Sequence, residues 1–329
     1  MPRLVLALFA TAAFLGAPAA PAADLGPRAR PGPERVAVLA AEWHDAARDR
    51  TLPVKLYVPQ GAGPFPVILF SHGLGGTRDA GREWAAHWAS HGYFVVALQH
   101  PGSDASLWRG ARSRDEAVRG LREGMTPHQL LARAGDVRFA LDELARRRDA
   151  GDPAVAAANL ARVGISGHSF GAQTTQAVAG ERFPVPVSLA EPRLAAAIAF
   201  SPSARGPEAA WPERFGGIAI PFFAITGTRD GDVAGTGATP ENRTLPFRHM
   251  SPPDKYLLVL EGADHMVFGG RPGLWRAASA EEAAQGRVVK AATLAFWDAY
   301  LKADGAARAW LAGGAFAAAL GDAGRFDAK

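Results

Sequence analysis

The sequence predicts an α/β fold built on one mostly parallel, doubly wound sheet. Short apolar runs of strand length alternate along the chain with longer amphipathic stretches of helix length. This alternation is typical of a parallel sheet that helices cover on both faces. Segments rich in glycine and proline separate the runs and supply the turns. The length of 329 residues is compatible with one large domain, and the sequence contains no internal repeat.

The predicted strands comprise a hairpin near the amino end and a series of buried strands. The apolar stretches Val36–Trp43 and Leu52–Val58 flank a polar segment, which predicts an antiparallel hairpin at the sheet edge. The later runs are short and continuous, as expected for strands covered on both faces. These runs are Phe65–Phe70, Tyr93–Leu98, Arg162–Ile165, Ala195–Phe200, Phe222–Thr226 and Tyr256–Leu260.

Helices are predicted between these runs from apolar side chains at helical spacing. Ser279 and Glu282 have the form of a capping box, so the last long helix should begin there. The predicted helices are Gly81–Ser90, Pro127–Arg148, Phe170–Ala179 and Ser279–Lys302, with a short alanine-rich helix after Asp304. Residues 100–127 break the pattern with a polar, arginine-rich segment, which we interpret as an excursion over the sheet and a candidate lid or cap.

The first 23 residues have the pattern of an export signal. Arg3 precedes the apolar run Leu4–Leu15, and Ala20-Pro21-Ala22 fits the small-x-small cleavage pattern. We therefore expect a signal peptide over 1–23, a mature domain over 24–329, and a periplasmic or secreted protein. An uncleaved anchor is the alternative. No later stretch reaches about 18 uncharged apolar residues, so no membrane span is expected after cleavage.

Composition excludes several other classes of function. The chain contains no cysteine, so it has no disulfide, no thiolate nucleophile and no cysteine metal site. The net charge is +4, but basic residues do not cluster with aromatic partners, so we expect no nucleic-acid partner. His44, His87, His91 and His249 are scattered and lack the spacing of metal ligands.

The segment Gly167-His168-Ser169-Phe170-Gly171 predicts a nucleophilic serine. It matches G-x-S-x-G between a predicted strand and a predicted helix, which is the context that this motif requires. Glycine on both sides lets backbones pass closely, and the helix start favours developing negative charge. The alternative is that Ser169 merely caps the helix.

A second glycine-rich loop, Ser71–Gly76, follows the predicted strand Phe65–Phe70. Its sequence has the H-G-x-G form of an oxyanion loop. We assign the two oxyanion donors to the backbone N–H groups of Leu74 and Phe170, because two such donors stabilise the charge that develops on an attacked carbonyl oxygen. A plain strand-to-helix turn, with His72 as a buried residue that stiffens it, is the alternative.

An acid and a base are predicted in two later loops. Asp230 closes a G-x-x-D pattern after the strand Phe222–Thr226, and we prefer it to Asp232 as the acid. His265 follows the strand Tyr256–Leu260 and is the predicted base, whereas we interpret its neighbour Asp264 as a loop residue. The order serine, aspartate, histidine is that of the α/β-hydrolase fold. A loop histidine or aspartate taken singly is more often a surface or turn residue.

Three segments resemble the serine esterases related to platelet-activating-factor acetylhydrolase, whose bacterial members are often labelled predicted dienelactone hydrolases. These segments are Phe70–Gly76, Ser90–Val96 and Gly167–Gly171. The resemblance extends roughly over Val36–Trp310 and implies no cofactor. It implies the nucleophile Ser169, the acid Asp230, the base His265, and the oxyanion donors Leu74 and Phe170. Dienelactone hydrolases use a cysteine nucleophile, so that label does not indicate the substrate here.

The function predicted from these residues is hydrolysis of a carboxylic ester through an acyl-enzyme. The expected substrates are small acyl esters, lipids or polyesters, and the loops after His100 and Ser201 should determine which. Amide or peptide cleavage on the same residues is the alternative, and an inactive binding protein is a third reading that the complete set of residues disfavours. Four aromatic residues fall in loops at the predicted site and either line a substrate pocket or pack: Trp108, Trp211, Phe215 and Trp275.

Overall fold

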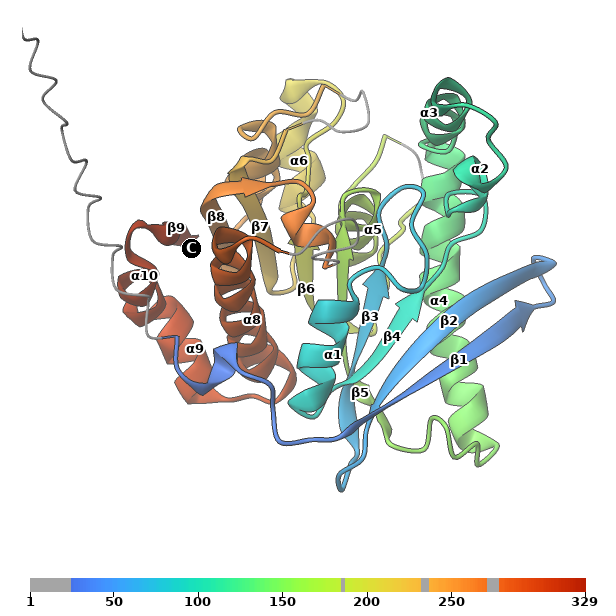
Figure 1. Cartoon of the computed structure of the whole chain (residues 1–329), viewed down its shortest axis with the longest axis horizontal. Helices are drawn as coiled ribbons and strands as arrows, with labels where there is room; N and C mark the ends of the chain where they lie inside the picture. The colour runs from blue at the N-terminus through green and yellow to red at the C-terminus, as the bar shows by residue number, and fades with distance from the viewer. Residues whose placement is uncertain (1–24, 185–186, 232–236, 271–277) are drawn as a thin grey trace, which may run out of the picture.

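The computed structural model describes residues 25–184, 187–231, 237–270 and 278–329. Within them, a single nine-stranded sheet is covered by helices on both faces (Figure 1). The predicted α/β fold is therefore confirmed, and it has the mixed, mostly parallel sheet of an α/β-hydrolase. The predicted signal peptide, Asp232 and Trp275 lie outside the described residues.

The strands run in the order β1-β2-β4-β3-β5-β6-β7-β8-β9 across the sheet. The six from β4 to β8 are parallel, whereas β1, β2 and β9 are joined by antiparallel pairs. Their bounds are β1 Val36–Asp45, β2 Arg50–Pro59, β3 Phe65–Ser71, β4 Phe94–Leu98, β5 Ala158–His168, β6 Leu194–Phe200, β7 Phe222–Arg229, β8 Lys255–Asp264 and β9 Gly324–Ala328.

The predicted edge hairpin is present, and β9 is a strand that the sequence pattern did not predict. β1 and β2 pair from Val36 with Pro59 to Asp45 with Arg50. β9 has the mixed sequence GRFDA without an apolar run, and it pairs with β8 at the opposite edge. It forms there because β8 would otherwise leave a row of unpaired backbone groups.

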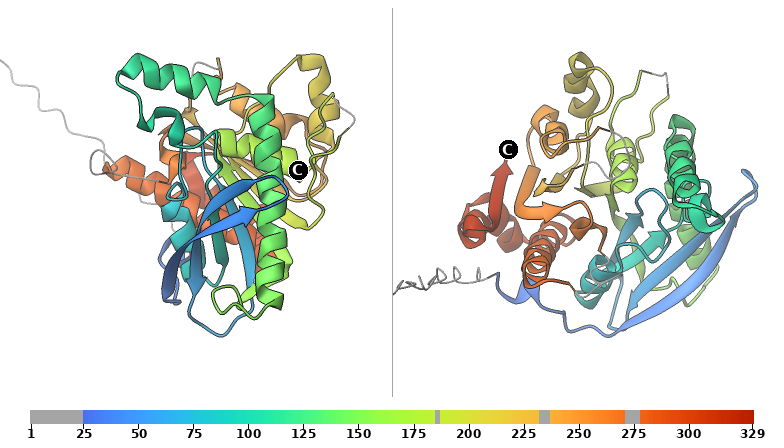
Figure 2. Two further views of the ribbon diagram at one scale, coloured as in Figure 1. Left: turned by 90° about the vertical axis from the view of Figure 1, so that its right-hand side faces the viewer. Right: turned by 45° about the horizontal axis from the view of Figure 1, so that its top comes forward.

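The long helices lie on the two faces of the sheet (Figures 1 and 2). α1, α8, α9 and α10 cover one face, and α4 and α5 cover the other. Ser279 caps α8 as predicted, because its hydroxyl accepts from the N–H of Glu282 and the Glu282 carboxylate accepts from the N–H of Ser279. The helix bounds are α1 Arg82–Ser90, α2 Ser106–Arg109, α3 Arg114–Glu123, α4 Pro127–Asp149, α5 Phe170–Ala179, α6 Trp211–Gly216, α7 Leu245–His249, α8 Ala280–Leu301, α9 Gly305–Ala312 and α10 Ala315–Leu320.

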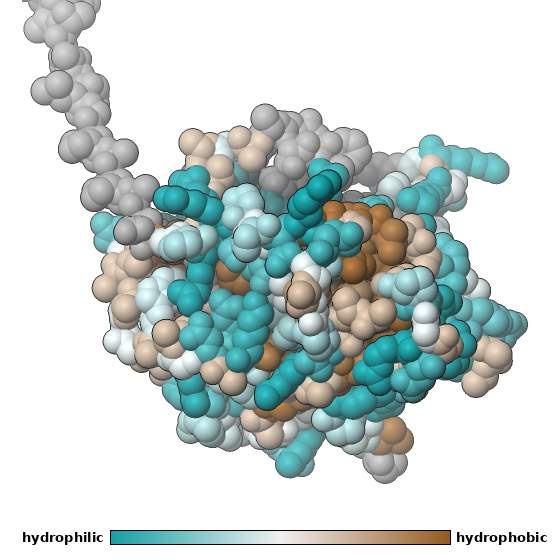
Figure 3. Space-filling model, turned by 90° about the horizontal axis from the view of Figure 1, so that it is seen from below, coloured by the Kyte–Doolittle hydropathy of each residue, from teal (hydrophilic) through white to brown (hydrophobic). Residues whose placement is uncertain are grey.

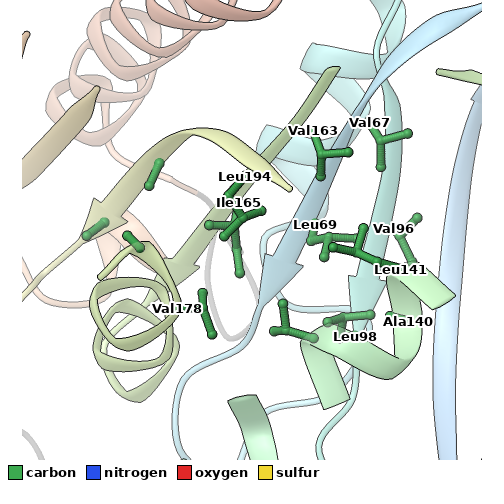
Figure 4. Close-up of a cluster of buried hydrophobic side chains, with 14 of the residues drawn as sticks. Val67, Leu69, Val96, Leu98, Ala140, Leu141, Val163, Ile165, Val178 and Leu194 are labelled. Carbon is green, nitrogen blue, oxygen red and sulfur yellow. The ribbon is translucent and has the colours of Figure 1, made fainter. Parts of the chain in front are cut away.

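Each face of the sheet buries its own hydrophobic core. On one side, side chains of β3, β4 and β5 pack against α4 and α5, as Leu69, Ile165 and Leu141 illustrate (Figure 4). On the other side, Trp88 of α1 packs edge-on against Trp297 of α8, with 5.8 Å between ring centroids. Strands buried on both faces explain the continuous apolar runs in the sequence.

The segment that interrupts the pattern, residues 100–127, forms the short helices α2 and α3 above the carboxyl ends of the parallel strands (Figure 2). The opposite end of the molecule exposes polar and apolar residues interspersed with each other (Figure 3). In the described part of the chain, no helix combines the length and apolar character needed to cross a membrane. The carboxyl edge beneath α3 is where an α/β sheet places its ligand site.

Candidate active site

Ser169 occupies a sharp turn between β5 and α5. Its backbone has φ 56° and ψ −112°, a conformation that costs a residue other than glycine roughly 1–3 kcal/mol. The turn brings backbones close together: a methyl group on Gly167 or Gly171 would overlap a neighbouring carbonyl oxygen. The two motif glycines are therefore required by contact, and the strained turn presents Ser169 at the start of α5, as predicted.

Asp230 and His265 are brought into direct contact. The Nδ1–H of His265 donates to Asp230 Oδ1 at 2.7 Å, and the hydroxyl of Thr226 donates to Asp230 Oδ2 at 2.8 Å. Burial opposes ionisation of Asp230, but the hydrogen bond from His265 and the charge of Arg243 outweigh it and lower the pKa of the carboxyl. Asp230 is therefore ionised and fixes the His265 tautomer, with Nε2 left to face a reacting group.

Arg243 is a buried arginine behind this pair that the sequence did not reveal. Its Nε lies 3.3 Å from Asp230 Oδ1, and its Nη1–H donates to the carbonyl oxygen of Ser201 at 3.1 Å. Further N–H groups point at the carbonyl oxygens of Asp230 and Gly231, at 3.4 Å each. The guanidinium thus holds both the carboxylate and the loop that carries it.

A second histidine, His168, lies against His265. The two ring centroids are 4.5 Å apart, and the Nε2–H of His168 donates to the carbonyl oxygen of His265 at 3.0 Å. Burial, with the neighbouring His265, lowers the pKa of His168 to about 3, so its ring stays neutral. Among the described residues, His265 contacts a carboxylate and His168 does not, which distinguishes His265 as the base.

The glycine-rich loop after β3 lies beside the serine. A methyl group on Gly73 would be 3.5 Å from Ser169 Cβ, which shows how closely the loop approaches the turn. Within the described residues, neither the N–H of Leu74 nor that of Phe170 donates to a backbone carbonyl. The geometry is therefore compatible with their predicted role as oxyanion donors.

A cavity of about 440 Å³ opens at this point. α3 contributes Val118, Leu121 and Arg122 to its wall, so the segment 100–127 does lie over the cavity. The remaining lining residues are Gly73, Leu74, Gly75, Gly76, Ala80, His168, Ser169, His265, Met266 and Gly269. Ser169, His265 and Leu74 thus line one cavity, while Asp230 is buried behind His265.

The predicted aromatic candidates serve mainly in packing. Phe215 is fully buried in the core, and the ring of Trp211 packs edge-to-face against the ring of His249. Trp108 is 42 % exposed and donates its indole N–H to the carbonyl oxygen of Gly75 at 2.8 Å, outside the cavity lining. None of these three lines the cavity.

Two polar residues near the site turn out to be structural. Asp264, next to His265, accepts from the N–H groups of Met266 and Val267, as a loop residue does. Asp104 accepts from the N–H and hydroxyl of Ser106 at the start of α2. Across the described ranges, no cluster of His, Asp and Glu side chains is arranged to hold a metal ion.

The sheet, the strained serine turn and the order Ser169, Asp230, His265 define an α/β-hydrolase. Residues 48–123 match the family model of platelet-activating factor acetylhydrolase, isoform II. No curated protein matches the chain. This segment is thus similar to a family of carboxylic ester hydrolases, and the sheet is consistent with the α/β-hydrolase fold. The matched region contains the oxyanion loop and α3 but none of the three candidate catalytic residues, whose roles rest on geometry.

Proposed function

We propose that the protein is an exported serine esterase in which Ser169 is the nucleophile, His265 the base and Asp230 the acid. The observation that carries this proposal is the 2.7 Å hydrogen bond from His265 to a buried carboxylate, at the rim of the cavity that Ser169 also lines. A serine becomes a strong nucleophile only when a correctly oriented base can take its proton.

In the acylation step, Ser169 Oγ attacks the carbonyl carbon of the ester and His265 Nε2 takes the hydroxyl proton. The carbonyl oxygen becomes an oxyanion, which the N–H groups of Leu74 and Phe170 stabilise; each such donor is worth about 2.7–4 kcal/mol. Asp230, held ionised by Arg243, stabilises the imidazolium that forms. The imidazolium then protonates the departing alcohol.

In the deacylation step, His265 takes a proton from water, and the resulting hydroxide attacks the acyl carbon. The same two N–H groups stabilise the second oxyanion. Collapse of this intermediate releases the acid and returns the proton to Ser169. Apart from this water, the groups that act on the ester in both steps are Ser169, His265, Asp230 and the two backbone N–H groups.

The cavity favours an apolar acyl or alcohol group of modest size. Its volume of about 440 Å³ is at the small end of the range for small-molecule sites. Val118 and Leu121 form its apolar wall on α3, and Met266, 59 % exposed, stands at its mouth. We therefore propose small acyl esters as substrates, with the larger lipid or polyester esters reached only if α3 moves.

The direct test is hydrolysis of p-nitrophenyl esters from acetate to laurate by the wild type and by Ser169→Ala. Wild-type kcat/KM should peak at short to medium acyl chains, and the variant should lose at least about 10³-fold, as expected for loss of a triad nucleophile. Asp264→Asn, at a loop carboxylate outside the cavity lining, is the control and should keep near wild-type activity. Undiminished hydrolysis by Ser169→Ala would overturn the proposal.

Export is proposed from the first 23 residues alone. Mass spectrometry of the mature protein recovered from the periplasm or medium should give an amino terminus near Ala23 or Asp24. An intact Met1 in that fraction would argue for an uncleaved anchor instead.

A further inference from the structure

A fully buried polar cluster lies directly behind the oxyanion loop. Ser71, His100, Arg133 and Asp136 are all 0 % exposed, and Arg50 joins them from β2. Burying charged groups is costly unless they are paired, and even paired groups often stabilise a fold less than apolar residues would. The position of this cluster, beneath the residues that would bind an oxyanion, suggests what it does.

The cluster includes a second Ser–His–Asp arrangement. Ser71 Oγ is 2.9 Å from His100 Nε2, and His100 Nδ1 is 2.9 Å from Asp136 Oδ2. None of the three lines the cavity, and Arg133 donates to the hydroxyl of Ser71 at 3.1 Å. No ester could reach Ser71, so this arrangement is structural.

Arg133 is the member that contacts both halves of the oxyanion site. Its Nη2–H donates to the carbonyl oxygen of His72, two residues before Leu74 in the loop. Its guanidinium also lies over the ring of Phe170, with Cζ 4.5 Å from the centroid. One side chain of α4 therefore links the two segments that supply the oxyanion donors, although these are about a hundred residues apart in the chain.

Neighbouring contacts extend this link to the loop that precedes α2. Arg133 Nη1 donates to the hydroxyl of Ser103 at 3.3 Å, and the carbonyl oxygen of Ser103 accepts from the N–H of Gly75 at 2.9 Å. His72 Nδ1–H donates to the carbonyl oxygen of Gly73, while Nε2 accepts from the N–H of His100 at 2.9 Å. The oxyanion loop is thus held on both sides of Leu74.

We infer that Arg133 is a positioning residue that sets the spacing between the N–H groups of Leu74 and Phe170. The inference rests on the proposed function and specifies how its oxyanion site is built. Donors must lie 2.7–3.1 Å from the oxyanion, so a small shift of either segment weakens the transition state more than the bound substrate. A planar guanidinium can stack on a ring and donate within its plane at the same time, which an ammonium cannot.

The test compares Arg133→Gln with Arg50→Gln, the same substitution at the other arginine of the cluster. Arg50 binds Asp136 at 2.7 and 2.8 Å but does not contact the oxyanion loop or Phe170. Both variants should lower the thermal midpoint. Arg133→Gln should also lose about 10²-fold in kcat for a p-nitrophenyl ester with KM changed less than about threefold, the loss expected from misplaced groups.

Two further readouts separate positioning from general loss of structure. Inactivation by a p-nitrophenyl phosphonate, whose P=O oxygen enters the oxyanion site, should slow in parallel with kcat in Arg133→Gln. Arg133→Lys should recover part of the thermal stability but less than half of the lost kcat on a logarithmic scale. If Arg133→Gln does not fold, the kcat of Arg133→Lys tests the inference instead. If neither variant folds, the kcat of Phe170→Leu tests it, because this substitution keeps the backbone N–H but removes the ring that Arg133 contacts.

The outcomes distinguish this inference from the proposed function. If Ser169→Ala keeps wild-type rates, the proposed function fails whatever the arginine variants do. If Ser169→Ala is inactive but Arg133→Gln loses no more kcat than Arg50→Gln, only the role of Arg133 is overturned. Unchanged kcat in a folded Arg133→Lys, or in Phe170→Leu where that variant decides, overturns it as well.

Discussion

Asp230→Asn should impair the enzyme through loss of charge and not through a reversed histidine tautomer. An amide can place its oxygen or its NH₂ group opposite His265 Nδ1. The Nε–H of Arg243, 3.3 Å from Asp230 Oδ1, would repel an NH₂ group at that position. The amide oxygen should therefore face His265 and Arg243, while its NH₂ group donates to the hydroxyl of Thr226, which lies 2.8 Å from Asp230 Oδ2.

The size of the effect follows from the lost ion pair. A carboxylate and an imidazolium about 4 Å apart attract by about 4 kcal/mol at an effective dielectric constant of 20. At about 1.36 kcal/mol per factor of ten, the predicted loss in kcat/KM is about 10³-fold. Asp230→Ala removes the hydrogen bond as well and should lose more, about 10⁴-fold.

The assay is kcat/KM for p-nitrophenyl butyrate and for an alkyl butyrate, whose poorer leaving group needs a proton from His265. Asp264→Asn is the matched control, because Asp264 precedes His265 and, within the described residues, accepts hydrogen bonds from the backbone N–H groups of Met266 and Val267. Its activity should stay within about threefold of wild type. Asp232→Asn tests the neighbouring carboxylate that the sequence left as the competing acid.

A result within tenfold of wild type for Asp230→Asn would refute the assignment of the acid, as would a larger loss in Asp232→Asn. If Asp230→Asn instead loses as much kcat/KM as Asp230→Ala, the argument that Arg243 keeps the amide oxygen facing His265 would be refuted. In that case the amide would have turned its NH₂ group toward His265.

Three further predictions concern the cavity, the serine turn and pH. Leu121→Ala enlarges the cavity wall and should raise the ratio of kcat/KM for decanoate to that for butyrate by about tenfold; an unchanged ratio would show that α3 does not determine chain length. Gly171→Ala should abolish activity and lower the thermal midpoint, because its methyl group would overlap the carbonyl oxygen of Ser71, whereas Gly110→Ala, which meets no atom within 4 Å, should be neutral in both assays. Burial, with His91 and Lys290 nearby, lowers the pKa of His87 to about 3, so the unfolded chain binds the extra proton between pH 6.5 and 3 and stability falls as pH falls through that window. In His87→Gln, the free energy of unfolding should fall less steeply with decreasing pH, by up to about 1.4 kcal/mol per pH unit, as measured by urea unfolding at pH 7, 5.5 and 4.5. If the free energy of unfolding depends on pH equally in the variant and the wild type, His87 is not the group responsible.

The features that the sequence determined are those with local signals. Buried strands leave continuous apolar runs, and the G-x-S-x-G turn at Ser169 needs its glycines because backbones touch there. The chain order of Ser169, Asp230 and His265 then predicted a shared site, because parallel strands end at the same edge of a sheet. The short strand β9 left no such signal, since its pairing depends on the exposed edge of β8 and not on its own pattern.

Only the tertiary structure decided which polar residues support the site. Arg243 and Arg133 lie in helices with no motif around them, and they become informative only where the fold aims them at Asp230 and at the carbonyl oxygen of His72. His100 is the first residue of the segment that the sequence marked as a candidate lid, but it lies buried beneath the oxyanion loop. A buried charge is tolerated only where partners distant in the chain converge on it, and that convergence is a property of the folded packing, which sequence spacing does not encode.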